Sequence, residues 1–220
     1  MLQLPQNITD SSHALFDSLA DALVEQGWFV LPGFLSSSLV NDLNEDIQYY
    51  QQNGSFIRAG VGRGDDFHID LTVRRDKTLW LRHETPAQVQ FLALMESLRL
   101  AMNQRLFLGL FEYESHFALY EPGAFYATHK DSFLGASNRI LSTVAYLNPA
   151  WSFEYGGLLR IFDEHNDTLL ADVLPEAGTL VVFLSEVIPH EVTRTERVRR
   201  SIAGWFRCNN NLDGVIDPVR

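Results

Sequence analysis

The chain has 220 residues, of which 46% are hydrophobic and 20% charged, and its formal net charge is −11. This length and apolar content support one hydrophobic core, and the negative charge argues against a nucleic-acid substrate, because Lys and Arg supply most of the affinity for phosphates. The single cysteine, Cys208, excludes an internal disulfide and a cysteine-based zinc site and fits a reducing cytoplasm.

The sequence carries no sign of a membrane or secretory segment. Residues 1–10 lack the basic region followed by an apolar core that a secretory signal needs, and no stretch approaches about 18 uninterrupted apolar residues. No internal repeat or Pro/Gly/Ser-rich linker divides the chain. We therefore expect a single domain over residues 1–220, a cytoplasmic location and no membrane partner.

The first half of the sequence predicts helices with a short strand between them. A helix follows the cap signal at residues 10–12 and ends at Gly27, and the strand Trp28–Leu31 comes next. A second helix spans Ser36 to Asn53, and Thr85-Pro86 opens a third. We expect these helices to pack on one sheet.

From about Glu112 onward, short β-rich runs alternate with Gly, Pro, Asn and Asp. The predicted strands are 112–120, 139–147, 157–163, 167–174, 179–185, 190–195 and 199–207. Regularly spaced strands of this kind favour a β-sandwich or barrel.

A His-x-Asp triplet, His129-Lys130-Asp131, lies in this half, and a further histidine, His190, follows it. Side chains at positions i and i+2 of a strand point to the same face, so His129 and Asp131 can reach one metal from one strand. Two imidazoles and one carboxylate can hold one face of Fe(II) and leave positions for a cosubstrate and O2. The pattern suggests a non-haem iron oxygenase, although His68-Ile69-Asp70 has the same triplet spacing without the other features.

Further motifs surround the triad. They are Tyr120-x-x-Gly123-x-x-Tyr126, Tyr146-Leu147-Asn148, Gly156-Gly157, Pro175-x-x-Gly178, Pro189-His190-Glu191-Val192 and Arg199-x-Ser201-Ile202. Together they resemble the prolyl-hydroxylase branch of the 2-oxoglutarate- and iron-dependent oxygenases. Upstream, Arg74 to Trp80 resembles the Arg-x-Asp-Lys-x-x-Trp stretch of the hypoxia-type prolyl hydroxylases and their bacterial relatives. The resemblance covers roughly residues 55–208.

This resemblance implies a mainly β fold with supporting α, a double-stranded β-helix (jelly roll) whose open mouth holds the iron. We expect residues 1–105 to supply helical support and the substrate loop, and residues 106–208 to form the jelly-roll catalytic core. The resemblance further implies Fe(II) bound by His129, Asp131 and His190, with 2-oxoglutarate and O2 as cosubstrates and ascorbate as reductant.

The far carboxylate of 2-oxoglutarate needs a cation, and a planar guanidinium matches a carboxylate with two parallel hydrogen bonds. Arg199 and Arg200 are both candidates, but adjacent residues of a strand face opposite sides. We favour Arg199, because its face also carries the small Ser201 and Ala203. The resemblance adds four further cosubstrate or pocket residues: Tyr146, Tyr120, Val192 and Leu159.

On the substrate side, the resemblance points to Arg139 and Trp205, and to the loop Gly60–Asp70, which contains Arg63 and is similar to a loop that folds over a bound peptide. We expect hydroxylation of a prolyl residue in a protein or peptide. Two alternatives stay open: a hydroxylase of a free amino acid or other small molecule, and a non-catalytic binding or sensor module. The target protein, the ring carbon, any oxygen-sensing role and the oligomeric state stay open too, and a monomer is compatible with the sequence.

Overall fold

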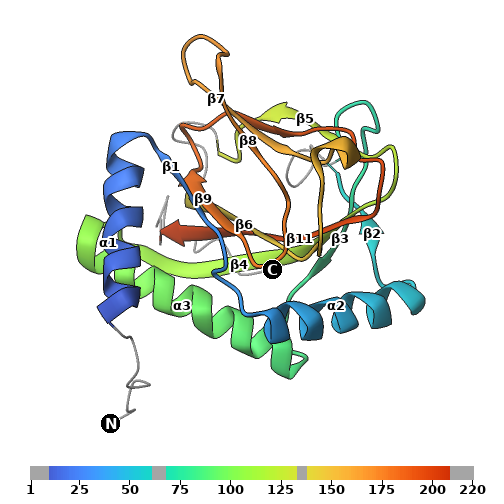
Figure 1. Ribbon diagram of the computed structural model, residues 1–220, viewed down its shortest axis with the longest axis horizontal. Coiled ribbons are helices and arrows are strands. Elements are labelled where there is room, and N and C mark those ends of the chain that lie inside the picture. The colour runs from blue at the N-terminus through green and yellow to red at the C-terminus, as the bar shows by residue number, and fades with distance from the viewer. Residues whose placement is uncertain (1–9, 61–67, 133–137, 209–220) are drawn as a thin grey trace.

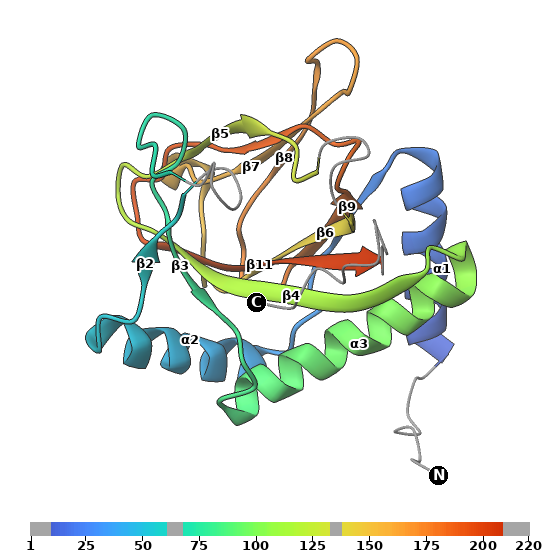
Figure 2. The same cartoon turned by 180° about the vertical axis from the view of Figure 1, so that it is seen from behind.

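The computed structural model describes residues 10–60, 68–132 and 138–208. In these ranges three α-helices, α1 (Asp10–Glu25), α2 (Ser37–Gln52) and α3 (Pro86–Leu106), accompany two antiparallel β-sheets. Figures 1 and 2 both show α3 running along β4 (Leu110–Tyr120) on the outside of the larger sheet. No helix among the described residues has the length and apolarity to cross a membrane.

The larger sheet has seven strands in the order β1-β9-β6-β11-β4-β3-β2. Besides β4 they are β1 (Trp28–Leu31), β2 (Ile57–Arg58), β3 (Lys77–Trp80), β6 (Arg139–Tyr146), β9 (Leu180–Leu184) and β11 (Arg199–Cys208). The smaller sheet has the order β5-β10-β7-β8, formed by β5 (Tyr126–His129), β10 (His190–Val192), β7 (Leu159–Phe162) and β8 (Leu169–Val173). It lies opposite the larger sheet in Figure 1.

The helix ends follow from capping side chains. The hydroxyl of Ser36 accepts a hydrogen bond from the Leu39 N–H, and that of Thr85 accepts one from the Gln88 N–H, so each satisfies a backbone donor that the first helical turn leaves unpaired. Pro86 occupies the first turn of α3, where its missing N–H costs nothing. The predicted second and third helices are thereby confirmed.

The main core lies between the helices and the outer face of the larger sheet. Leu43 of α2, Met95 of α3 and Phe117 of β4 belong to one buried cluster and have no exposed surface. Burying a large apolar side chain contributes roughly 1.5–3 kcal/mol. This core confirms that the helices pack on one sheet, and it fixes the larger sheet as a rigid wall.

A second buried cluster fills the space between the two sheets. Tyr146, Val181 and Phe183 reach it from the larger sheet, and Leu159 and Ile161 from the smaller one. Alternation along each strand separates these residues from those that face the helices. The inner face of the sandwich is therefore where a site between the sheets can form.

The structure differs from the sequence expectations in two respects. The strand predicted at Trp28–Leu31 is present as β1, but the N-terminal half also supplies β2 and β3 to the larger sheet, so residues 1–105 contribute more strands than expected. The predicted strands 157–163, 167–174 and 190–195 are shorter than expected, and β10 ends at Val192. After β10 the backbone turns, and the Thr193 N–H donates to Leu158 O and the Thr195 N–H to Ala124 O.

Candidate active site

The two histidines and the aspartate of the predicted triad converge at one end of the smaller sheet. His129 ends β5 and lies directly opposite His190 of β10 in the strand register. His129 Nε2 lies 3.4 Å from Asp131 Oδ1, and His190 Nε2 lies 3.8 Å from Asp131 Oδ2. One potential ligand atom from each residue lies within 4.8 Å of the other two. The three side chains could thus hold one metal ion.

Asp131 does not lie on β5 beside His129, as the spacing of the two residues predicts. Asp131 lies in a bend beyond the end of β5, so the expectation of two ligands on one strand is wrong. On the neighbouring strand the residue before His190 is Pro189, which has no N–H to donate, and the ladder stops at the pair His129–His190. The bend then turns the carboxylate back toward both imidazoles.

Each imidazole is oriented by a backbone carbonyl. His129 Nδ1 lies 2.8 Å from Ala127 O, and His190 Nδ1 lies 3.0 Å from Ile188 O. A carbonyl can only accept, so Nδ1 carries the proton in both rings and the lone pair of Nε2 points to the shared space. Tyr126 stacks on His129, with ring centroids 3.6 Å apart, and restricts its rotation.

The protonation states suit metal binding. Burial lowers the pKa of His190 to about 4, and neighbouring His129 adds to this effect. Burial by itself would raise the pKa of Asp131, but His190, His129 and a hydrogen bond from Ser142 outweigh it and hold the pKa well below its usual range. Near neutral pH the carboxylate is ionised and His190 is neutral, as ligands must be.

Ser142, which the sequence interpretation did not single out, holds the carboxylate of Asp131. Its hydroxyl donates to Asp131 Oδ2 at 2.7 Å and lies 2.9 Å from Ser185 Oγ. Both serines are buried. The only signal in the sequence is a small polar residue within the β6 run, on the strand face that also carries Val144 and Tyr146.

Arg199 lies at the start of β11 on the inner face and is 1% exposed. Its Nε donates to Gly157 O at 2.8 Å and its Nη1 to Ser201 Oγ at 3.0 Å. Among the described residues, neither its Nη2 nor the Tyr146 hydroxyl has a hydrogen-bond partner, although both are buried. Buried polar groups are normally paired, so these two atoms indicate a missing ligand.

Tyr146 lies beside this guanidinium, with its ring centroid 5.1 Å from Arg199 Cζ. Burial raises the pKa of Tyr146 to about 12, an effect that Arg199 partly offsets, so the hydroxyl keeps its proton and can donate. A carboxylate can accept hydrogen bonds from a charged N–H group and a hydroxyl that lie side by side.

The other predicted pocket residues surround this pair. Tyr120 is opposite Arg199 in the strand register, and its ring centroid lies 4.8 Å from Arg199 Cζ. Leu159 and Val192 face each other across β7 and β10 and are both buried. Leu159 packs in the cluster of Tyr146, and Val192 in that of Tyr120. The four side chains form apolar walls around the guanidinium.

Arg200 points the opposite way, as strand alternation predicts. Its Nη1 donates to Asn44 Oδ1 of α2 at 3.2 Å, on the helix side of the larger sheet. It is therefore separated from the inner face by β11 itself.

The predicted substrate residues Arg139 and Trp205 lie together on the larger sheet. Arg139 Cζ lies 3.6 Å from the centre of the Trp205 ring, and Arg139 Nη2 donates to Glu114 at 2.8 Å. Trp80 and the buried His116, which the sequence interpretation did not assign to the site, extend this wall. Arg63 and most of the predicted loop lie outside the described residues.

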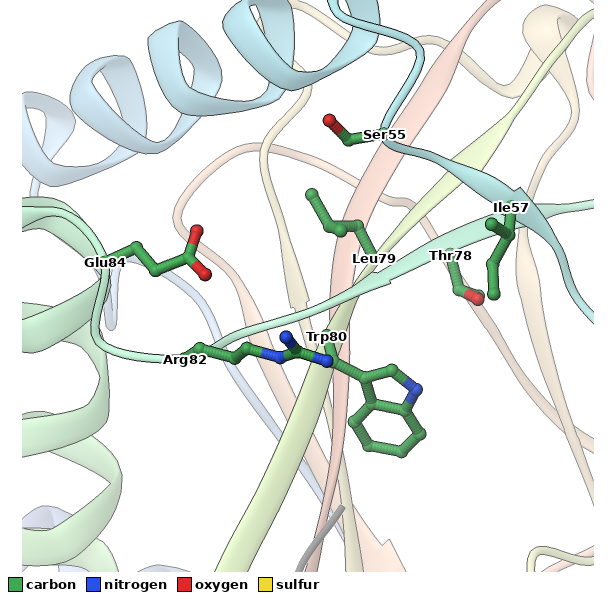
Figure 3. Close-up of a pocket in the computed structure, with 7 residues that line it drawn as sticks. All are labelled: Ser55, Ile57, Thr78, Leu79, Trp80, Arg82 and Glu84. Carbon is green, nitrogen blue, oxygen red and sulfur yellow. The ribbon is translucent and has the colours of Figure 1, made fainter.

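A hollow of about 230 Å³ opens beside Trp80, between β2 and the end of β3 (Figure 3). It is lined by Ser55, Ile57, Thr78, Leu79, Trp80, Arg82 and Glu84. It is thus next to the Trp205 wall but separate from the histidine cluster. The second triplet lies apart too: His68 is exposed and Asp70 is half-buried, and the one cluster of potential metal ligands among the described residues is that of His129, Asp131 and His190.

Comparison with known proteins identifies the arrangement. A family model described as the 2OG-Fe(II) oxygenase superfamily matches residues 115–207. A crystal structure of a Pseudomonas putida prolyl-4-hydroxylase is 41% identical, covers 88% of this chain and 99% of that chain, and superposes with a TM-score of 0.81. The chain belongs to the prolyl 4-hydroxylase branch of the 2OG-Fe(II) oxygenases. The match also confirms the jelly-roll fold.

Two curated animal proteins are similar to this oxygenase. The hypoxia-inducible factor prolyl hydroxylase of Caenorhabditis elegans is 28% identical in an alignment of 208 residues that covers 89% of this chain and 28% of that protein. The mouse prolyl hydroxylase EGLN3 is 28% identical in an alignment of 206 residues that covers 90% of this chain and 85% of that protein. The chain thus spans less than a third of the nematode protein.

Membership of this family implies Fe(II), 2-oxoglutarate and O2, and the residues present fit them. Two imidazole nitrogens and one carboxylate oxygen are the donor set of the two-histidine, one-carboxylate iron site. The unpaired Arg199 Nη2 and Tyr146 hydroxyl fit the far carboxylate of 2-oxoglutarate.

Proposed function

We propose that this protein hydroxylates a prolyl residue in a protein or peptide, using Fe(II), 2-oxoglutarate and O2. The observation that carries the proposal is the pair of unpartnered buried donors, Arg199 Nη2 and the Tyr146 hydroxyl, inside the same sandwich as the His-Asp-His cluster. When bound, the iron and 2-oxoglutarate supply oxidative decarboxylation, in which one oxygen atom of O2 enters succinate and the other enters a C–H bond of the substrate.

His129, Asp131 and His190 are proposed to hold the metal. Their contribution is a fixed set of donors: the histidine rings are held through Nδ1, and one oxygen of Asp131 is held by Ser142. Hydrogen bonds of this kind to metal ligands orient them and tune the site.

Arg199 and Tyr146 are proposed to bind the far carboxylate of 2-oxoglutarate, while Tyr120, Leu159 and Val192 enclose it. Because Arg199 is held by Gly157 and Ser201, its position is set before the cosubstrate arrives. The apolar walls exclude water, and in such surroundings a charge-assisted hydrogen bond is stronger than at the surface.

Arg139 and Trp205 are proposed to contact the substrate chain. The Arg139 guanidinium is fixed over the indole by Glu114, so both present one ordered surface. The relatives at 41% and 28% identity are named prolyl hydroxylases, and this supports a prolyl substrate here. Arg63 is proposed to contact the same peptide from the loop.

The remaining proposals concern context. We propose that residues 1–220 form one oxygenase domain, with residues 106–208 as its catalytic core, that ascorbate serves as reductant, and that the protein acts in the cytoplasm without nucleic-acid or membrane partners. A monomer is the simplest assembly compatible with the sequence.

The test compares substrates. Purified protein is incubated with Fe(II), 2-oxoglutarate, O2 and either a library of prolyl peptides or free L-proline and other amino acids, and succinate and the added mass of one oxygen atom are measured. Hydroxylated peptides, absent with His190→Ala, are expected. Hydroxylation of free amino acids only would replace the proposal with a small-molecule hydroxylase, and no succinate from any substrate would favour a non-catalytic module.

A further inference from the structure

A second hollow, of about 180 Å³, lies between the turn at residues 147–151 and the start of β11. Two arginines, Arg197 and Arg200, line it together with Trp151 and Pro149. Arg200 is on the strand face opposite to Arg199, so this hollow and the 2-oxoglutarate pocket are separate. A water molecule needs only about 10–15 Å³ of such space, so a small molecule fits.

Both arginines lack a carboxylate partner in the part of the chain that the structure describes. The ion-paired arginines of that part are Arg74, Arg99, Arg105, Arg139, Arg160 and Arg207. Two guanidinium groups facing one hollow are therefore left with positive charge that no carboxylate of the described residues neutralises.

Of the two arginines, Arg200 is the more buried. It is half-buried, its Nε has no hydrogen-bond partner within the described residues, and its one side-chain partner is the neutral amide of Asn44. Burial lowers the pKa of Arg200, with no neighbouring charge to offset it. A buried charge without a counter-charge is costly, and an anion would remove that cost.

The walls of the hollow are held in place. The Arg200 N–H donates to Asn148 Oδ1 at 2.7 Å, and Arg200 O accepts from the Asn148 amide at 3.0 Å. Arg197 lies flat on Tyr155, with its Cζ 3.6 Å from the ring centre. Stacking leaves the N–H groups at the guanidinium edge able to donate. Little rearrangement would accompany binding.

We propose that this hollow binds a small oxyanion, a free carboxylate or phosphate, through Arg197 and Arg200. Guanidinium groups bind both anions with paired, charge-assisted hydrogen bonds. The site would be additional to the 2-oxoglutarate pocket and does not depend on the proposed reaction.

The experiment titrates the purified protein with inorganic phosphate and, separately, with succinate at constant ionic strength. Binding is followed by the fluorescence of Trp151, which lines the hollow, and by calorimetry. Wild type is compared with Arg200→Gln and with Arg197→Gln. Trp151→Phe identifies the source of the optical signal, and Arg160→Gln controls for the loss of a surface charge.

Saturable binding of at least one anion is expected in wild type and in Arg160→Gln. Arg200→Gln should weaken it at least about tenfold, and Arg197→Gln should weaken it as well, because a charge-assisted hydrogen bond is lost. The stronger of the two anions identifies the ligand class. The proposal would be overturned if the wild type showed no saturable binding, or if neither Arg200→Gln nor Arg197→Gln weakened binding relative to the wild type. Arg197 is exposed, so its variant keeps the test valid if Arg200→Gln fails to fold.

Discussion

At the scale of single residues, the most informative atoms are buried polar groups without partners. Arg199 and Arg200 are adjacent in the sequence, yet one contacts Gly157 on the inner face and the other Asn44 on the helix side. This separation can be predicted from the sequence, because successive side chains of a strand point to opposite faces of the sheet. The contribution of Ser142 was not predictable, since it depends on a bend that brings Asp131 back beneath β6.

Replacing Arg199 with Gln should raise the KM for 2-oxoglutarate by about one and a half to three and a half decades, because removing one partner of a buried charge-assisted pair costs roughly 2–5 kcal/mol. Arg200→Gln is the control, and it should change the KM little. Steady-state succinate production at varied 2-oxoglutarate provides the measurement. An equal or larger effect of Arg200→Gln would reverse the assignment.

Ser142→Ala should weaken Fe(II) binding by about 10–100-fold, the usual effect of losing a hydrogen-bond partner of a metal ligand. The variant removes the hydroxyl that fixes Asp131 Oδ2 and leaves the ligand set intact. Competition with a chelator measures the affinity, and Ser97→Ala, on the exposed side of α3, is the control. Unchanged affinity in Ser142→Ala would mean that the bend alone positions the carboxylate.

His116 should make the protein less stable in acid. Burial, with a smaller contribution from Arg74, lowers its pKa from 6.5 to about 4. Between these values the unfolded chain binds a proton that the folded chain does not, so stability falls as pH drops from about 6.5 toward 4, by about 3 kcal/mol in total. Urea unfolding at pH 7 and pH 5 should show a smaller difference for His116→Phe than for wild type. The same pH dependence in both proteins would contradict this.

At the scale of elements, regular spacing was predictable and local exceptions were not. The caps Ser36 and Thr85 mark helix starts by side-chain chemistry that the sequence displays directly. By contrast, β2 and β3 carry too few residues for a recognisable period, and the end of β5 depends on pairing with β10 across a proline. The candidate site lies where such long-range pairing decides the geometry. The residue types of the cluster can therefore be read from the sequence, whereas the bend at Asp131 cannot.

Gly157 connects the loop before β7 to the arginine of β11. Its φ is +65°, and an added Cβ would lie 3.0 Å from Arg199 Cδ, whereas a Cβ at Gly109, with φ of +64°, would meet nothing within 4 Å. Both alanine variants should lose roughly 1–2 kcal/mol of stability through backbone strain. Only Gly157→Ala should also raise the KM for 2-oxoglutarate. Equal KM values for the two variants would show that this close contact does not position Arg199.

At the scale of the whole molecule, the two sheets contribute different residues to the candidate site. Helices bury the outer face of the larger sheet and make it rigid, while the smaller sheet supplies His129 and His190 from its end. Arg199 and Tyr146 come from the inner face of the larger sheet. The two histidines proposed to bind the metal and the two donors proposed for the cosubstrate thus belong to different sheets, and the fold as a whole sets their separation.

The most direct test of this account is anaerobic titration of the purified protein with Fe(II) and 2-oxoglutarate, followed by visible absorption. The wild type should develop the weak charge-transfer band of a 2-oxoglutarate–iron complex, His68→Ala should retain it, and Asp131→Ala and His190→Ala should lose it. A band that persists in Asp131→Ala and His190→Ala but disappears in His68→Ala would contradict the account and move the metal to the other triplet.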